Sequence, residues 1–191
     1  MLLTIDIGGT YIKYGLMDRN YHLVHTEKIP TPPTIEEFWQ GLEGIVDPVR
    51  GQIDGIAISC PGEIQKTLGF VFRGGLIPYL RNIPLASRLK QSFHFPVTVL
   101  NDGDAAGLAE ARLGNLQNCP CGATLVLGTG VGLAFLSNGE LLNGWQLTEH
   151  LRGRSFDLSE RTPENRRFHR ELFLQGISNL LENTGSAVHF V

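Results

Sequence analysis

Near its start the sequence reads Leu3-Thr4-Ile5-Asp6-Ile7-Gly8-Gly9-Thr10, an apolar β-type segment that ends in a carboxylate and a pair of glycines. Two adjacent glycines allow a tight turn whose bare backbone N–H groups can approach phosphate. Asp6, at the strand end, is suited to hydrated Mg²⁺, and Thr10 and Lys13 are candidates for further contacts. A plain Gly-Gly hairpin explains the same residues equally well, so this turn alone decides nothing.

A second glycine turn, Leu127-Gly128-Thr129-Gly130-Val131-Gly132, lies between two further β-type segments. Two such turns, each opening a lobe, suit a nucleotide clamped between domains, and together they favour phosphate binding over plain hairpins. No Gly-Lys-Ser/Thr follows either turn, which excludes a Walker loop. A strand rather than a helix is predicted after each turn, which argues against a Rossmann fingerprint.

The hydrophobic periodicity predicts an α/β protein with two lobes, residues 1–115 and 116–191. Residues 74–79 are predicted as loop, and a polar stretch at 152–170 leaves the second lobe thin. Thr34 is predicted to cap the first helix, with Glu37 three residues later. The predicted elements are strands 2–7, 11–17 and 21–29, helix 34–50, strand 53–60, helix 84–93, strand 97–100, helix 104–113 and strands 123–127 and 131–136.

Two carboxylates follow the apolar strand 97–100, in the segment Asn101-Asp102-Gly103-Asp104. Ligands of α/β proteins collect at such strand ends. Asp104 fits the N-cap of the helix after it, which leaves Asp102 free. Phosphoryl transfer to a hydroxyl group needs a carboxylate that orients the hydroxyl and accepts its proton. Asp102 is therefore the candidate base, with Asn101 as a hydrogen-bonding neighbour.

Composition narrows the class of protein. The 191 residues include 16 Lys and Arg against 19 Asp and Glu, so the net charge is −3 and no basic excess favours nucleic acid. No apolar run approaches bilayer length and the N-terminus lacks the features of a signal peptide, which predicts a cytoplasmic protein without membrane contact. Three cysteines are too few for a disulfide framework, and reduced thiols are expected.

Five segments, taken in order, resemble the successive signatures of the ROK family of sugar kinases. They are Asp6-Ile7-Gly8-Gly9-Thr10, Ser59-Cys60-Pro61-Gly62, Gly74-Gly75-Leu76-Ile77-Pro78-Tyr79-Leu80, Asn101-Asp102-Gly103-Asp104-Ala105-Ala106 and Leu127-Gly128-Thr129-Gly130-Val131-Gly132. The resemblance covers about residues 2 to 140. It implies the two-lobed, actin-like ATPase (ribonuclease H-like) fold, with a shortened second lobe here.

The resemblance also implies an activity: ATP-dependent phosphorylation of a sugar hydroxyl, with a hexose or glucoside as substrate. Asp102 would be the catalytic base, and Gly75 and Asn101 would contact the sugar beside it. A homodimer is a further implication. The residues implied for ATP and its Mg²⁺ are Asp6, Gly8, Gly9, Thr10, Gly128, Thr129, Gly130, Val131 and Gly132, with Asp6 as the metal ligand.

The sequence departs from the family pattern after the second glycine turn. The family's Glu-x-Gly-His substrate motif is represented only by Glu149-His150, with different spacing, and these two residues are further sugar-binding candidates. Cys119-Pro120-Cys121 precedes the second glycine turn, whereas the zinc-binding cysteines of the family follow that turn. No zinc site is therefore predicted at Cys119 and Cys121. No helix-turn-helix precedes the first strand, which favours the kinases over the family's repressors.

Two alternatives stay open at this point. The chain is either an active kinase or a catalytically impaired, ROK-derived protein that binds sugar or regulates, since its substrate motif and zinc cluster are altered or absent. A third interpretation is that the chain is part of a longer kinase.

Overall fold

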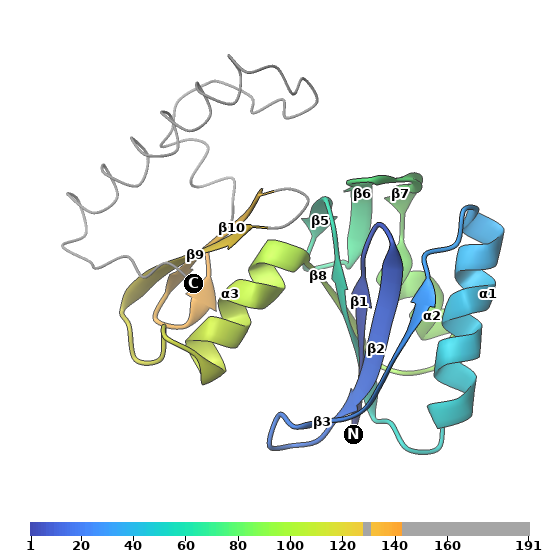
Figure 1. Cartoon of the computed structure of the whole chain (residues 1–191), viewed down its shortest axis with the longest axis horizontal. Coiled ribbons are helices and arrows are strands. Elements are labelled where there is room, and N and C mark those ends of the chain that lie inside the picture. The colour runs from blue at the N-terminus through green and yellow to red at the C-terminus, as the bar shows by residue number, and fades with distance from the viewer. Residues whose placement is uncertain (128–130, 143–191) are drawn as a thin grey trace, which may run out of the picture. The chain divides into compact units, whose positions relative to one another are not determined.

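The computed structural model describes residues 1–127 and 131–142 (Figure 1). The chain forms two compact units, Met1–Ala105 and Ala106–Val191, which are treated separately below. The lobe boundary placed at residue 115 from the sequence stays a prediction. Within the described residues, no helix combines the length and the apolar character that crossing a bilayer requires.

The first unit is built on a five-stranded sheet in the order β3-β2-β1-β4-β8. The three strands predicted at the N-terminus are confirmed, and they pair as an antiparallel meander. β4 and β8 continue the sheet parallel to β1, so the carboxyl ends of these three strands share one edge. The strands are β1 (Leu2–Ile7), β2 (Tyr11–Met17), β3 (Leu23–Pro30), β4 (Gly55–Cys60) and β8 (Val97–Asn101).

Alternating side chains place this sheet against an apolar core. In β1, Leu3, Ile5 and Ile7 are buried while Thr4 and Asp6 are partly exposed, the period of two that a half-buried strand requires. β3 is different, because nearly all of its residues are exposed and, within residues 1–127 and 131–142, it pairs with β2 alone. Its register shifts by a bulge opposite Gly15 and Leu16.

The first helix, α1 (Ile35–Val46), begins where the sequence predicted. The Thr34 hydroxyl oxygen accepts a hydrogen bond from the Glu37 N–H at 3.3 Å, which confirms the N-cap. The helix ends four residues earlier than predicted, because residues Asp47–Val49 tighten into a 3₁₀ turn that contains Pro48. Figure 1 shows α1 alongside the sheet, where its buried residues join the core.

A second sheet of this unit was missed by the sequence analysis. It has the order β5-β6-β7 and is antiparallel throughout, with β5 (Glu63–Gln65), β6 (Phe70–Gly74) and β7 (Ile77–Ile83). The loop predicted at 74–79 is wrong except at Gly75 and Leu76, which form the turn of a hairpin in which Gly74 pairs with Ile77. Pro78 fits because β7 is an edge strand, where a missing N–H costs no ladder bond. α2 (Leu85–Phe93) follows, one residue later than predicted, with Pro84 at its N-cap.

The helix α3 (Asp102–Leu113) runs from the end of the first unit into the second and begins two residues earlier than predicted. In the second unit a sheet of order β11-β10-β9 is formed by β9 (Cys121–Leu127), β10 (Val131–Ser137) and β11 (Glu140–Leu141). The predicted strand pair around the second glycine turn is confirmed. A Cβ at Gly107 would stand 2.8 Å from Ala134 Cβ, so this helix lies against β10.

Candidate active site

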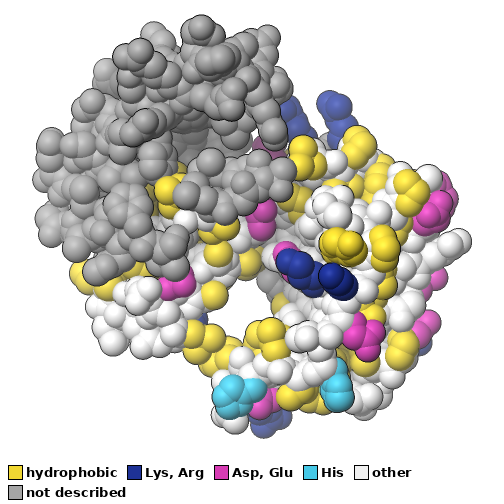
Figure 2. Space-filling view, viewed as in Figure 1, with side chains coloured by type: hydrophobic (Ala, Val, Ile, Leu, Met, Phe, Trp, Pro, Cys, Tyr) yellow, Lys and Arg dark blue, Asp and Glu magenta, His cyan; other side chains and the backbone are white. Residues whose placement is uncertain are grey.

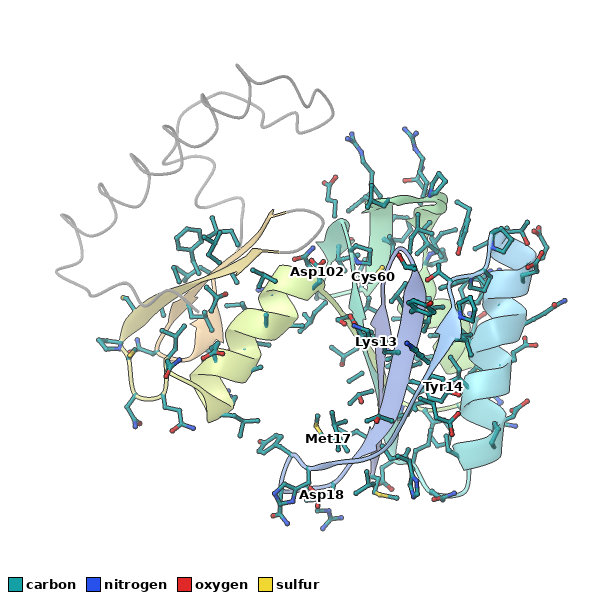
Figure 3. The ribbon with its side chains drawn as sticks, viewed as in Figure 1. Lys13, Tyr14, Met17, Asp18, Cys60 and Asp102 are labelled. Atoms are coloured by element: carbon teal, nitrogen blue, oxygen red, sulfur yellow. The ribbon has the colours of Figure 1, made fainter. Side chains whose placement is uncertain are left out.

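The candidate site lies in the first unit, at the edge where β1, β4 and β8 end. Parallel pairing sets Asp6 opposite Ser59 and Cys60 opposite Asn101. Figure 3 shows Cys60 and Asp102 at this same end of the sheet. Carboxyl ends of parallel strands are where α/β proteins bind ligands, because the following turns leave backbone groups available there. Figure 2 shows small groups of basic side chains and separate acidic side chains on the visible surface of the described residues.

Both oxygens of the Asp6 carboxylate have a partner. Ser59 Oγ donates a hydrogen bond of 2.6 Å to Oδ1, and Lys13 Nζ lies 3.6 Å from Oδ2. Lys13 reaches it from β2, directly across the antiparallel pair. The side chain of Asp6 is 49% exposed, so it is oriented yet open to solvent. Such a carboxylate fits Mg²⁺, which usually keeps several waters and takes only one or two protein carboxylates.

The two glycines of the turn after β1 have different structural roles. Gly8 donates its N–H to Tyr11 O at 3.0 Å, and a Cβ on Gly8 would stand only 2.8 Å from that oxygen. At Gly9 the nearest atom to an added Cβ is Leu76 Cβ at 3.6 Å, an ordinary contact. No hydrogen bond among the described residues uses the Gly9 N–H. Gly8 therefore builds the turn, and Gly9 carries the available donor.

Two further turns meet beside this one. Gly62 has φ +97°, and a Cβ there would clash with the carbonyl oxygen of Arg73. Gly75, at the tip of the β6–β7 hairpin, has φ +61°, and its added Cβ would lie 3.3 Å from Pro61 Cβ. Close approach of the two backbones thus depends on glycine at both positions. The contact brings Gly75, which is predicted to contact the sugar, next to the segment that follows β4.

Asn101 caps α3, a role the sequence analysis gave to Asp104. Its Oδ1 accepts hydrogen bonds from the N–H groups of Gly103 at 2.8 Å and Asp104 at 3.4 Å. Its Nδ2 donates to Gly62 O at 2.7 Å. The N-cap assigned to Asp104 is wrong, because Asn is an equally good cap and comes first in the chain. The predicted sugar contact of Asn101 stays a prediction.

Asp102 is the first residue of α3 and is exposed. Its Oδ1 accepts a hydrogen bond from the neighbouring Gly103 N–H at 2.9 Å. Among the described residues no ion pair engages it. A carboxylate placed in this way is held by the backbone at one oxygen and remains accessible for accepting a proton.

The buried Cys60 thiol lies among these acids. Burial, followed by the negative charges of Asp102 and Asp6, raises its pKa to about 12. The Cys60 thiol is therefore neutral, and the negative charges of both carboxylates disfavour its ionisation. Burial also raises the pKa of Asp104; Lys66 opposes this shift, and Asp102 reinforces it.

The sequence analysis assigned no role to Ser59 or Thr31. Ser59 reaches Asp6, and Thr31 Oγ1 donates to Gly8 O at 2.6 Å. The signal available for Ser59 was a polar residue at the end of an apolar strand. For Thr31 it was a hydroxyl between Pro30, the last residue of β3, and Pro32.

The described residues contain no group of three or more His, Cys, Asp or Glu placed to hold a metal. Cys119 and Cys121 are free thiols. The predicted phosphate residues Gly128, Thr129 and Gly130 lie outside the described residues, as do Glu149 and His150. Val131 and Gly132 begin β10. The roles assigned to all of these from the sequence stay predictions.

The comparisons of this chain with a family model, with curated proteins and with solved structures agree with one another on its family. The model of the ROK family matches residues 2–151. The chain is 30% identical over 143 residues to a β-glucoside kinase of Listeria monocytogenes, covering 75% of this chain and 49% of that protein. It is 30% identical over 146 residues to an N-acetylmannosamine kinase of Salmonella newport, covering 74% and 49%. The chain thus spans about half the length of these curated relatives.

The fold agrees with a solved structure of the same family. A ROK family glucokinase from Streptomyces griseus, in complex with glucose and AMPPNP, superposes with a TM-score of 0.65 and 29% identity. The likeness covers 80% of this chain and 47% of that one. The α/β, actin-like ATPase fold predicted from the sequence is confirmed.

Proposed function

Because the chain belongs to the ROK family, we propose that it carries the nucleotide and sugar sites of an ATP-dependent sugar kinase. The observation that carries this proposal is the placing of Asp6 and Asp102 at one edge of one sheet, each at the end of a parallel strand or just beyond it. The relatives named as kinases of a β-glucoside, of N-acetylmannosamine and of glucose support a hexose or glucoside as the substrate class.

Asp6 and the turn after it would hold Mg²⁺ and ATP. The fit is supported by the half-exposed carboxylate of Asp6 and by the available N–H and free space at Gly9. Thr10, Lys13 and the turn Gly128 to Gly132 complete the proposed phosphate contacts. When bound, Mg²⁺-ATP supplies the phosphoryl group and the positive charge that offsets its oxygens. The residues of the chain then act by orienting groups and moving one proton.

Asp102 would act as the general base. Its carboxylate accepts a hydrogen bond from the sugar hydroxyl and takes the proton as that oxygen bonds to the γ-phosphorus in line. The bond from that phosphorus to the bridging oxygen of ADP breaks, and ADP leaves with the electron pair. Gly75 and Asn101, together with Glu149 and His150, are proposed to contact the sugar. A cytoplasmic location and a homodimer belong to the same proposal.

The test is an ADP-release assay with glucose, N-acetylmannosamine and a β-glucoside, comparing the chain with Asp102→Asn. Loss of a general base lowers kcat by about 10²- to 10⁴-fold, while AMPPNP affinity stays the same. The matched control is Asp47→Asn, since Asp47 is an exposed carboxylate whose ion pair with Arg50, at 3.9 Å, is weak. Full activity of Asp102→Asn would refute the assignment.

Calorimetry separates the kinase from the alternative, a sugar-binding protein without turnover. An active kinase binds AMPPNP with Mg²⁺ and also binds sugar. Sugar binding without any nucleotide binding would favour the alternative.

A further inference from the structure

We propose that Thr31 is a positioning residue that fixes the direction in which Gly9 presents its N–H to a phosphate oxygen. This inference rests on the proposed kinase function and deepens it. Thr31 would act through the backbone of the turn, without touching the nucleotide.

Thr31 holds the turn at two points, one on each side of Gly9. Its hydroxyl Oγ1 donates a hydrogen bond of 2.6 Å to Gly8 O. Its own N–H donates one of 3.0 Å to Thr10 O. The Gly8–Gly9 and Thr10–Tyr11 peptide units are thus both hydrogen-bonded to Thr31, the residue directly after β3.

The planarity of the peptide group turns the first of these bonds into an orientation. The Gly8–Gly9 peptide is trans, so the carbonyl of Gly8 and the N–H of Gly9 point in opposite directions. Fixing the carbonyl toward Thr31 therefore fixes the N–H away from it. Glycine on both sides lets this peptide rotate at little steric cost. Rotation would break the Thr31 bond, which is what opposes it.

Thr31 is a firm anchor because its own segment is held independently of the turn. Tyr79 Oη donates a hydrogen bond of 2.6 Å to Pro32 O, and Thr34 caps α1. Burial raises the pKa of Tyr79, so its hydroxyl remains a donor. Pro32 and Pro33 restrict the backbone between these points. Segment 31–34 is thereby held at Pro32 and at Thr34. The position of this segment in turn determines the position of the glycine turn that is hydrogen-bonded to Thr31.

The experiment compares Thr31→Val with Thr31→Ser in the full chain. Valine keeps the shape and the backbone N–H but removes the hydroxyl donor, whereas serine retains the donor. The matched control is Thr4→Val, because Thr4 Oγ1 also donates to a glycine carbonyl, that of Gly15 at 3.0 Å, in mid-strand. The readouts are AMPPNP affinity with Mg²⁺ by calorimetry, KM for ATP and for sugar, and the amide signal of Gly9 in ¹⁵N spectra.

Loss of one hydrogen bond corresponds to about a three- to tenfold change in an equilibrium. We expect Thr31→Val to weaken AMPPNP binding and raise KM for ATP by about that factor, with KM for sugar unchanged and the Gly9 amide signal shifted or broadened. Thr31→Ser restores binding, and Thr4→Val leaves it unaltered.

Three results would overturn the inference. If Thr31→Val binds AMPPNP normally, it fails while the kinase proposal stands. If Thr31→Val and Thr4→Val weaken binding equally, the hydroxyl serves stability alone. If the unaltered chain binds no AMPPNP, both proposals fall together.

Discussion

Ser59 and Asp6 stand in register on the parallel strands β4 and β1, and the Ser59 hydroxyl donates a 2.6 Å hydrogen bond to the Asp6 carboxylate. The second partner of this carboxylate, Lys13, is 66% exposed and 3.6 Å away, so its hold is loose. Ser59 is therefore the group that sets the plane of the carboxylate, since a hydrogen bond to a charged acceptor is the stronger of the two contacts.

Replacing Ser59 by alanine tests this hold. We expect Ser59→Ala to fold normally but to weaken Mg²⁺-dependent AMPPNP binding by about tenfold, because hydrogen bonds to charged groups contribute about 1.5–3 kcal/mol. The measurement is a Mg²⁺ titration at fixed AMPPNP. Ser87→Ala, an exposed serine of α2, is the control. Equal affinity in both variants would contradict the role given to Ser59.

The glycine pair of the first turn predicts opposite outcomes for two alanine substitutions. Gly8→Ala forces a Cβ to 2.8 Å from Tyr11 O, and we expect a loss of about 1–3 kcal/mol in the free energy of unfolding. Gly9→Ala meets no atom closer than 3.6 Å, and Gly9 has no positive φ. Its stability should remain within about 0.5 kcal/mol of the unaltered chain. Urea unfolding of both variants is the measurement, and equal destabilisation would contradict the division of tasks.

Asp104 predicts a pH dependence of stability. Burial raises its pKa above 3.8 in the folded state, so the folded chain holds this proton more tightly than the unfolded chain. The contribution of Asp104 is therefore fully present below pH 3.8 and is lost as pH rises through the folded-state pKa. Asp104→Asn should raise the melting temperature near neutral pH, and the gain should shrink in acid. A variant that is less stable at pH 7 would show that the charge of Asp104, beside Lys66, is needed.

The cysteines should differ in reactivity. Cys60 is fully buried with a pKa raised to about 12, whereas Cys119 and Cys121 are partly exposed. Because the thiolate is the reactive form, a thiol reagent at pH 8 should label two cysteines of the native chain quickly and the third only after denaturation. Cys60→Ala identifies the slow site by removing it. Rapid labelling of all three in the native state would contradict the burial of Cys60.

The sequence allowed the main sheet and α1 to be predicted because their signals are local. Leu3, Ile5 and Ile7 alternate with polar residues, and Thr34 with Glu37 forms a recognisable cap. The β5–β6–β7 sheet was missed because its strands are short and its hairpin contains Gly75 and Pro78, which resemble loop residues out of context. Tertiary contact, such as that of Gly62 with Arg73, favours a hairpin here, with Gly75 in its turn and Pro78 in the strand after it.

The candidate site was predicted in part for a similar reason. Position along the chain identified Asp6 and Asp102, since Asp6 lies near the end of one apolar strand and Asp102 comes directly after another. The partners Ser59 and Thr31 lie 53 and 23 residues from the groups they bind, and no spacing rule connects residues so far apart. The helix cap was predicted at Asp104 but is Asn101. Asn and Asp have nearly equal capping preference, so the residue type alone does not show at which of the two the helix begins.

The exposed strand β3 carries a consequence for handling the protein. An unpaired edge of this length invites a second molecule to add a strand, the first step toward aggregation. Three features of β3 disfavour the addition of such a strand, which requires a flat and uncharged edge. They are the bulge beside Gly15, the charges of Glu27 and Lys28, and the terminal Pro30. Substitutions that remove these charges, the bulge or Pro30 would therefore make β3 a better template for a second molecule, although the strand contributes little to the core.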